Sequence, residues 1–402
     1  MSKTIQVLIA LILGLVLGIL TSVSENSILK SFVEIGTPIG KLWVNGIRMT
    51  VIPLVISLLI TGIASTSFQK FGQIGSKAIL WFLLLVLGSS ALTAFLAPTL
   101  LELGNIDSDI SKTLSDSVIN KGVDLPLFSD WIVELIPPNP ISAAAEGAML
   151  PLIIFTIIFG ISITKIDENP RQKLITFFDA IAKSMLIIVE WILFVAPIGV
   201  FFLVLPLAAN AGVDLVFAMG WFLIVACGLI VLSILILYPL TSYFSKVSIK
   251  DFALACAPAQ AIGFSTRSSL ASLPAMIEAA DHKLKLPVEI SGVVLPVAVA
   301  LLKFASPIAR GTGTIFVAYL YGIDLSTFEI ITIMAAIGAL SFYSPGVPSG
   351  GLFIMTPVYL SLGLPVEGIG LLIALDLIPD MFITLANVTA DMSVATILGS
   401  KK

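Results

Sequence analysis

Two basic side chains, Lys303 and Arg310, lie inside a stretch that is otherwise apolar enough for the core of a membrane, residues 295–320. One cation at bilayer depth costs on the order of 3 kcal/mol. Pro307 follows closely, and a proline inside a helix removes a backbone N–H and clashes with the preceding turn, so we expect the helix to break at residues 305–307. A broken helix that carries charge at mid-membrane marks a solute or ion site more often than a structural accident.

A second group of polar side chains lies on the last apolar segment of the chain. Its members are Asp376, Asp380, Thr384, Asn387 and Asp391. Spacings of four, four, three and four residues place them on one face of a helix. Carboxylates in a membrane need cations nearby, and the same half of the chain contains Arg267, Lys303 and Arg310. These groups either form buried ion pairs alone or build a site. The Gly/Ser/Pro-rich segments beside them favour a site.

The composition is that of an integral membrane protein. Only 11% of the 402 residues are charged and 58% are hydrophobic, whereas a soluble protein carries about a quarter charged residues. A net charge of −4 argues against a nucleic-acid partner. We expect neither an enzyme nor a metal site, and no cofactor, because His282 is the only histidine, Cys227 and Cys256 lie apart, and no nucleophile or phosphate-binding motif occurs.

Apolar runs of about 20 residues predict six membrane helices in the first part of the chain. They lie near residues 5–23, 42–64, 78–100, 149–163, 174–205 and 215–238. The first run lacks a small-residue cleavage site, so we interpret it as a membrane helix rather than a signal peptide. Lys and Arg gather in the loops of one side if both termini are cytoplasmic, which places the acidic segment 104–130 outside.

After residue 250 the pattern changes. Segments 252–276 and 330–362 are too interrupted for simple spans and too apolar for loops, and each has a tip of small residues. Each precedes a full-length helix, at 288–320 and at 369–398. The pattern predicts two re-entrant helical hairpins in inverted repeats, which is typical of transporters. The fold class is therefore an all-α multi-pass membrane protein with eight transmembrane helices and two re-entrant hairpins.

With these residues in view, the chain resembles the dicarboxylate/amino acid:cation symporter family, the glutamate transporter homologues, over nearly its whole length. The resemblance is carried by segments in matching order, namely 45–65, 134–161, Ala196-Pro197-Ile198-Gly199-Val200, the Ser-rich tip 266–274, the tip Gly346-Val347-Pro348 and Asn387-Val388-Thr389-Ala390-Asp391. It implies a homotrimer with a fixed scaffold, against which a transport domain slides as an elevator, in a prokaryotic cytoplasmic (inner) membrane.

The resemblance also implies how the chain is divided between these two parts. Residues 1–170 hold mainly scaffold helices 1, 2 and 4, with transport-domain helix 3 at about 76–104. Residues 171–245 hold scaffold helix 5 and transport-domain helix 6. The transport-domain core fills 246–402, with hairpin 1 at about 247–278, helix 7 at 287–322, hairpin 2 at 327–364 and helix 8 at 366–399.

Site residues follow from the same resemblance, position by position. Asp380 matches the aspartate that holds a substrate amino group, Asn387 the asparagine near the substrate α-carboxylate, and Asp391 a sodium-ligating carboxylate. The complete set expected to bind substrate is Arg267, Ser268, Ser269, Ser306, Val347, Gly351, Asp380, Thr384 and Asn387. The set expected to couple ions is Lys303, Asp376 and Asp391.

The sequence departs from the family where sodium binds. The family's Asn-Met-Asp-Gly-Thr motif falls on residues 302–306, which read Leu-Lys-Phe-Ala-Ser. Its deepest sodium site falls on Phe82, Leu85 and Val86, and its substrate-binding arginine on Ile383. Sodium needs several oxygens, which these side chains do not supply.

We therefore hypothesise that the Lys303 ammonium occupies the place of a sodium ion, opposite Asp391 or Asp380. Burial and a neighbouring carboxylate act oppositely on a lysine, so Lys303 or an aspartate could exchange protons and couple them to transport. Alternatively, Lys303 receives a substrate carboxylate. The predicted function is sodium-independent secondary transport of a small organic solute, preferably a neutral amino acid. A C4-dicarboxylate transporter, a sodium-coupled amino acid symporter, and a channel or binding-only sensor stay open, as does the role of Arg310.

Overall fold

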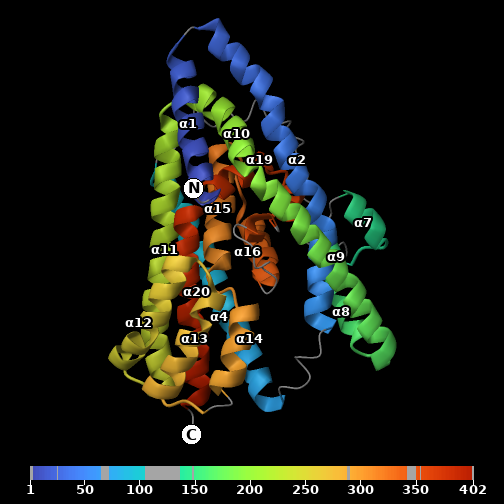
Figure 1. The fold of residues 1–402 in the computed structure, drawn as a ribbon, viewed down its shortest axis with the longest axis vertical. Coiled ribbons are helices and arrows are strands. Elements are labelled where there is room, and N and C mark those ends of the chain that lie inside the picture. Colours follow the sequence, from blue (N-terminus) through green and yellow to red (C-terminus); the bar gives the residue numbers. More distant parts are fainter. Residues whose placement is uncertain are drawn as a thin grey trace.

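The computed structural model describes residues 3–24, 26–64, 72–104, 136–146, 149–287, 290–341, 350–353 and 355–400. Every regular element within these ranges is a helix (Figure 1). The helices of the first half are α1 (Lys3–Val23), α2 (Ser27–Ala64), α4 (Gly72–Glu102), α7 (Pro140–Glu146), α8 (Met149–Ile163), α9 (Glu168–Phe194), α10 (Ala196–Ala211) and α11 (Asp214–Ser245). The second half contains α12 (Ile249–Thr266), α13 (Ser269–Glu278), the π-helices η1 (Ala279–Lys283) and η2 (Ile290–Val294), α14 (Leu295–Leu301), α15 (Ser306–Leu320), α16 (Thr327–Leu340), α17 (Gly350–Phe353), α18 (Thr356–Ser361), α19 (Glu367–Leu375) and α20 (Leu377–Gly399).

Several of these helices are long and apolar enough to cross a membrane. Within the described residues they are Ser76–Glu102 of α4, together with α11 and α20. A fourth span results if α9 and α10, which meet at 59°, are one broken span. The apolar run at 174–205 thus folds as two helices that meet at Val195 instead of one. The chain is an all-helical protein of the membrane-spanning type.

The N-terminal helices pack mainly with α8, α9 and α10. α1 and α2 pack against α10, and α2 also packs against α8 and α9, so that these helices lie together at one end of the molecule and along one side (Figure 1). At Gly18 and Gly40 a Cβ atom would collide with the α10 backbone. Small residues at such crossings allow helices to approach closely, which is how helices associate in a membrane.

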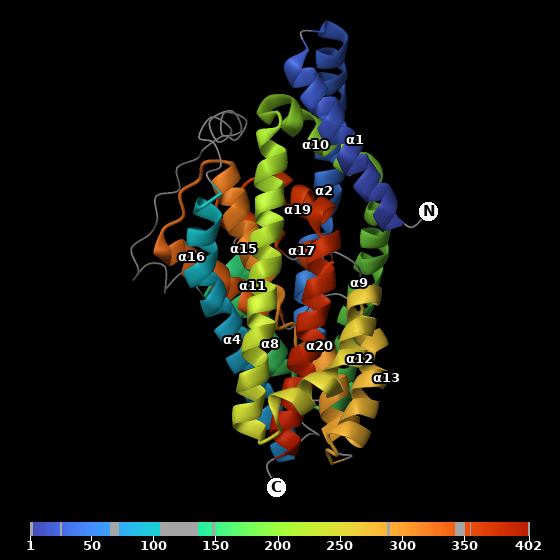
Figure 2. The same ribbon diagram turned by 90° about the vertical axis from the view of Figure 1, so that its left-hand side faces the viewer.

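The last helix, α20, lies in the interior of the bundle. It packs against α4, α11, α12, α13 and α14 (Figure 2), and every residue from Ala386 to Ile397 is buried. The polar side chains of this buried stretch, Asn387 and Asp391 among them, therefore face protein and must find partners there, whereas Asp380 near the start of α20 is partly exposed. The fold brings α12–α13 and the broken helix α14–α15 to this polar face.

Helices occupy both segments in which we expect re-entrant hairpins. α12 and α13 pack against each other and are joined by Arg267 and Ser268. In the second segment, α16 is followed by the short helices α17 and α18, and the expected tip at 346–348 lies outside the described residues. The count of eight membrane helices with two hairpins stays a prediction.

Candidate functional site

The break in the charged helix lies at Leu302–Ala305, between α14 and α15. Leu302 is extended, with φ −84° and ψ 109°. Pro307 is not in the break: it lies in the first turn of α15, where its missing N–H would have had no partner in the helix. The break therefore comes about one turn before the expected 305–307, since the proline starts the second helix instead of interrupting the first.

Two side chains satisfy backbone groups that the break exposes. Lys303 Nζ donates a hydrogen bond to the carbonyl oxygen of Val299, 2.6 Å away at the end of α14. Asn387 Oδ1 on α20 accepts a hydrogen bond from the Ala305 N–H at 3.0 Å. Irregular backbone at membrane depth is tolerated when such groups are paired within the protein. Lys303 and Asn387 thus stabilise the irregular backbone of the break, and Asn387 also connects it to α20.

Asp391 is fully buried on α20, and neither of its carboxylate oxygens accepts a hydrogen bond from a described residue. Its electrostatic partner is Lys303. An isolated buried carboxylate costs several kcal/mol, so the ammonium and the carboxylate stabilise one another. Asp391 is one of the two partners that we expect for Lys303 from the sequence, the other being Asp380.

The turn between α12 and α13 approaches the start of α20. Arg267 has a left-handed backbone, φ 54°, which is unfavourable for a residue with a side chain. Ser268 caps α13 by accepting a hydrogen bond from the Ala271 N–H, and Ser269 begins that helix. Arg267 Nη1 lies 3.9 Å from Asp380 Oδ2. Strained backbone of this kind persists where the surroundings hold it in place and is common at binding sites.

Arg310 belongs to the same cluster, although the sequence did not assign it a role. It lies on α15 and interacts electrostatically with Asp376, where α19 meets α20, and with Asp380. Its guanidinium packs against Gly351 in α17, in the space that a Cβ atom there would fill. The signal in the sequence was the seven-residue spacing from Lys303, which is close to two helical turns, and the equal number of acids and bases.

The remaining expected residues have other environments. Thr384 is buried and donates from Oγ1 to the Asp380 carbonyl of its own helix, 2.9 Å away. The Ser306 hydroxyl is buried in the first turn of α15 and has no hydrogen-bond partner in the described parts of the chain. Val347 lies outside the described residues. Of the expected set, the structure therefore brings to one region Arg267, Lys303, Gly351, Asn387 and the carboxylates of Asp376, Asp380 and Asp391.

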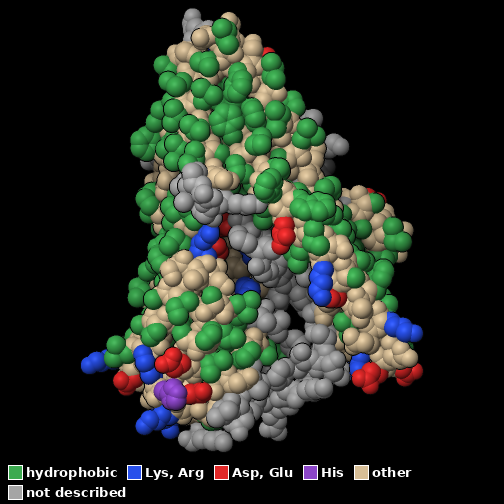
Figure 3. Space-filling model, viewed as in Figure 1, with side chains coloured by type: hydrophobic (Ala, Val, Ile, Leu, Met, Phe, Trp, Pro, Cys, Tyr) green, Lys and Arg blue, Asp and Glu red, His purple; other side chains and the backbone are tan. Residues whose placement is uncertain are grey.

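The cluster has two groups of balanced charge, Lys303 with Asp391, and Arg267 and Arg310 with Asp376 and Asp380. Lys or Arg atoms are visible inside the hollow near the centre of the face in Figure 3. In the described residues, no three His, Cys, Asp or Glu side chains come together as metal ligands would. The arrangement can bind a molecule that carries both charges, or move a proton.

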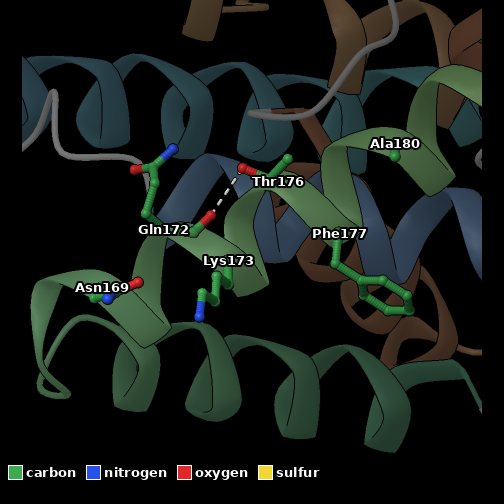
Figure 4. A pocket seen from close by; sticks show the side chains of 6 residues that line it. All are labelled: Asn169, Gln172, Lys173, Thr176, Phe177 and Ala180. Atoms are coloured by element: carbon green, nitrogen blue, oxygen red, sulfur yellow. Dashed lines mark hydrogen bonds between the residues drawn. The ribbon is translucent and has the colours of Figure 1, made fainter.

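A separate hollow lies along α9 (Figure 4). Its lining comes from that helix alone: Asn169, Gln172, Lys173, Thr176, Phe177 and Ala180. The hydroxyl of Thr176 donates to the Gln172 carbonyl of the same helix, and Lys173 is the one charged group in the lining. It contains none of the cluster residues, and we assign it no part in the site.

Comparison with known proteins agrees with this description. A family model described as "Sodium:dicarboxylate symporter family" matches residues 4–401. The chain is 28% identical over 393 residues to a proton/glutamate-aspartate symporter of Escherichia coli, covering 96% of this chain and 90% of that protein. It is 27% identical over 402 residues to a proton/sodium-glutamate symport protein of Geobacillus stearothermophilus (98% and 93%). It is 28% identical over 393 residues to a neutral amino acid transporter B(0) of Bos taurus (90% and 72%).

Proposed function

The chain belongs to the sodium:dicarboxylate symporter family, so it is a membrane transporter and not an enzyme, and we propose that it carries a zwitterionic amino acid without sodium. In this proposal Lys303 replaces a sodium ion, and protons are the coupling ion. Solute binds between the Arg267 turn, the break before α15 and the polar face of α20.

The observation that carries the proposal is the position of the Lys303 ammonium. It binds a main-chain carbonyl at the end of a half-helix, that of Val299, and faces the buried carboxylate of Asp391. A carbonyl at a helix C-terminus and a carboxylate are the kind of oxygens that hold a hard cation. A tethered ammonium between them neutralises the same charges permanently.

The side chains at the family's sodium positions support the same conclusion. Leu302, Phe304 and Ala305 are buried and carry no side-chain oxygen. In α4, Phe82, Leu85 and Val86 are also buried and apolar. A sodium ion placed there would lose most of its hydration without equivalent ligands. These residues do not fit the ion that the family description names.

The charge balance around Asp380 favours a zwitterion. Asp380 and Asp376 are balanced by Arg267 and Arg310. A solute with one ammonium and one carboxylate leaves the net charge of these four side chains and the solute at zero, whereas an acidic amino acid would add a buried negative charge. Ile383, at the position of the family's substrate-binding arginine, supplies no cation to offset it. An acidic solute would therefore need a proton, as in the relatives named proton symporters.

The direct test is solute binding by the purified protein in sodium, potassium or choline chloride. A thermal-shift screen of amino acids and C4-dicarboxylates across pH identifies the solute first. We expect the affinity for a neutral amino acid to be equal in the three salts. Strong dependence on sodium would overturn the proposal in favour of a sodium-coupled symporter.

Other functions predict different outcomes. If Lys303 instead receives a substrate carboxylate, Lys303→Met abolishes binding in every salt. A C4-dicarboxylate transporter gives its largest thermal shift with succinate or malate. Counterflow in proteoliposomes separates a transporter from a channel or a sensor, because only a transporter accelerates uptake when solute is present on the far side.

We also propose the family-level organisation that the sequence suggested: a homotrimer whose scaffold stays fixed while the domain containing α12–α20 slides as an elevator in a prokaryotic inner membrane. The packing of α1 and α2 with α10, apart from α20, supports two such parts. Mass measurement of the detergent-solubilised protein tests the trimer. Cross-linking between α2 and the second part in two positions tests the sliding.

A further inference from the structure

We propose that Arg310 determines the net charge of the solute that the site accepts. The proposal deepens the function above and rests on it, because it requires a solute ammonium to bind at Asp380. Arg310 interacts with that same carboxylate. The side chain and the solute therefore compete for one partner.

The geometry confines the Arg310 guanidinium to this place. Its carbon and nitrogen atoms pack against the backbone of Gly351, where any side chain would collide with them. Asp380 and Asp376 are one helical turn apart, and the Asp380 N–H donates to the Asp376 carbonyl at 2.8 Å. Arg310 therefore packs on α17 and interacts electrostatically with both carboxylates, first with Asp376, so it keeps a partner in the cluster when a solute ammonium binds Asp380.

The sum of the charges in the cluster shows how Arg310 affects solute binding. Without solute, Arg267 and Arg310 neutralise Asp376 and Asp380. When a zwitterion binds, its ammonium pairs with Asp380, Arg310 keeps Asp376, and the solute carboxylate lies close to two guanidinium groups. A solute without the carboxylate would place a third cation beside two others. Like charges in an environment of low dielectric repel strongly, so Arg310 excludes cationic solutes.

A purely structural role for Arg310 predicts something else. If the guanidinium only held α17 against α20, its loss would weaken binding of every solute alike. Charge selection predicts a change in the ratio between solutes that differ in charge but not in shape. An amino acid and its carboxamide are such a pair, because the amide lacks the negative charge and carries a net charge of +1.

The experiment compares affinities for alanine, serine, leucine, their carboxamides and glutamate in full-length wild type, Arg310→Gln and Arg310→Lys. We expect wild type and Arg310→Lys to prefer the amino acids. Arg310→Gln should shift the ratio towards the carboxamides by about tenfold or more, since one unit charge is lost close to the ligand. Asp376→Asn removes an acid from the same cluster and should shift the preference the other way, towards glutamate.

The outcomes separate the two proposals. Binding by wild type with unchanged ratios in Arg310→Gln and Asp376→Asn would overturn charge selection alone. If Arg310→Gln does not fold, the ratio of the affinities of Asp376→Asn for glutamate and for the neutral amino acids tests charge selection by itself. If folded wild type binds none of these probes, the proposed neutral amino acid function fails, and the inference about Arg310 fails with it.

Discussion

Lys303→Met keeps the length and the apolar stem of the side chain but removes the positive charge that faces Asp391. The carboxylate is fully buried and has no hydrogen-bond partner in the described residues. Leaving a buried charge without its partner costs about 3–5 kcal/mol. Coulomb's law gives about 4 kcal/mol for two unit charges at about 4 Å and an effective dielectric constant of about 20, and less at a larger separation. The lost hydrogen bond to the Val299 carbonyl contributes about 1 kcal/mol, so the electrostatic effect dominates.

We therefore expect Lys303→Met to lower the free energy of unfolding by about 3 kcal/mol, measured by thermal unfolding in detergent. The Asp391→Asn change alone should also destabilise the protein, because it leaves the Lys303 ammonium without a negatively charged partner. The double variant should be more stable than the sum of the two predicts, by about 2 kcal/mol or more, since it removes both charges. Lys303→Met should not make solute binding dependent on sodium, because Leu302, Phe304 and Ala305 supply no side-chain oxygen for the ion.

Lys183→Met is the matched control. Lys183 lies 2.6 Å from Asp179 on the exposed part of α9, with side-chain exposures of 71% and 45%. A surface pair of this kind contributes about 0–1 kcal/mol. Equal stability of Lys303→Met and Lys183→Met, together with additive effects of Lys303→Met and Asp391→Asn, would refute the pairing of Lys303 with Asp391.

Three further changes test contacts within and around the cluster. Asn387→Ala removes the acceptor of the Ala305 N–H in the break and should cost about 1–3 kcal/mol in thermal unfolding. Gln260→Leu breaks the hydrogen bonds from Nε2 to Thr389 Oγ1 of α20, 2.7 Å long, and to Tyr238 Oη of α11, 2.9 Å long, and should cost about 1–2 kcal/mol by the same measurement. Gly351→Ala displaces the guanidinium that packs on it and should weaken solute binding about tenfold in a titration.

Matched variants serve as controls for these three predictions. Asn387→Asp retains an oxygen acceptor and should destabilise through charge instead, with a response to pH that Asn387→Ala lacks. Gln172→Leu changes an exposed side chain of α9 and should be neutral. Gly338→Ala adds a methyl group in α16, where the nearest atom is Ser90 Oγ at 3.5 Å, and should bind solute normally. If Gly351→Ala binds solute as tightly as Gly338→Ala, the Gly351 contact plays no part in binding.

Local patterns in the sequence predicted much of the helical framework. α8 spans Met149–Ile163, the run that hydropathy indicated, and the α20 polar stripe followed from its spacing. The bend at Val195 was missed, because hydropathy does not respond to helix direction and Pro197 lies within an unbroken apolar run. The position of the break was wrong by about one turn, since a proline can end one helix or begin the next.

The contacts that complete the site could not be predicted from spacing alone. The packing of Arg310 on Gly351 depends on how α17 folds back against α15, which joins residues 41 positions apart. The equal number of acids and bases indicated that a cluster would form, because three acids and three bases in one half of a membrane protein need one another as partners. Which acid meets which base depends on the rotation of α15 after the break, and that is set by Asn387 and the backbone of Ala305.

The position of Lys303 limits what can drive transport. A sodium ion in this place would enter from one side and leave on the other, and its gradient would do the work. A lysine bound to the Val299 carbonyl of α14 stays with the protein through every cycle, so its charge adds nothing to the driving force. Net accumulation of solute must then come from an ion that still exchanges, and a proton on Asp391 or on Asp380 needs no ring of oxygens to hold it. If neither carboxylate takes up a proton during the cycle, the protein can only exchange one solute molecule for another or let the solute move down its own concentration gradient. Measuring uptake under an imposed pH gradient, in the absence of sodium, distinguishes these two cases.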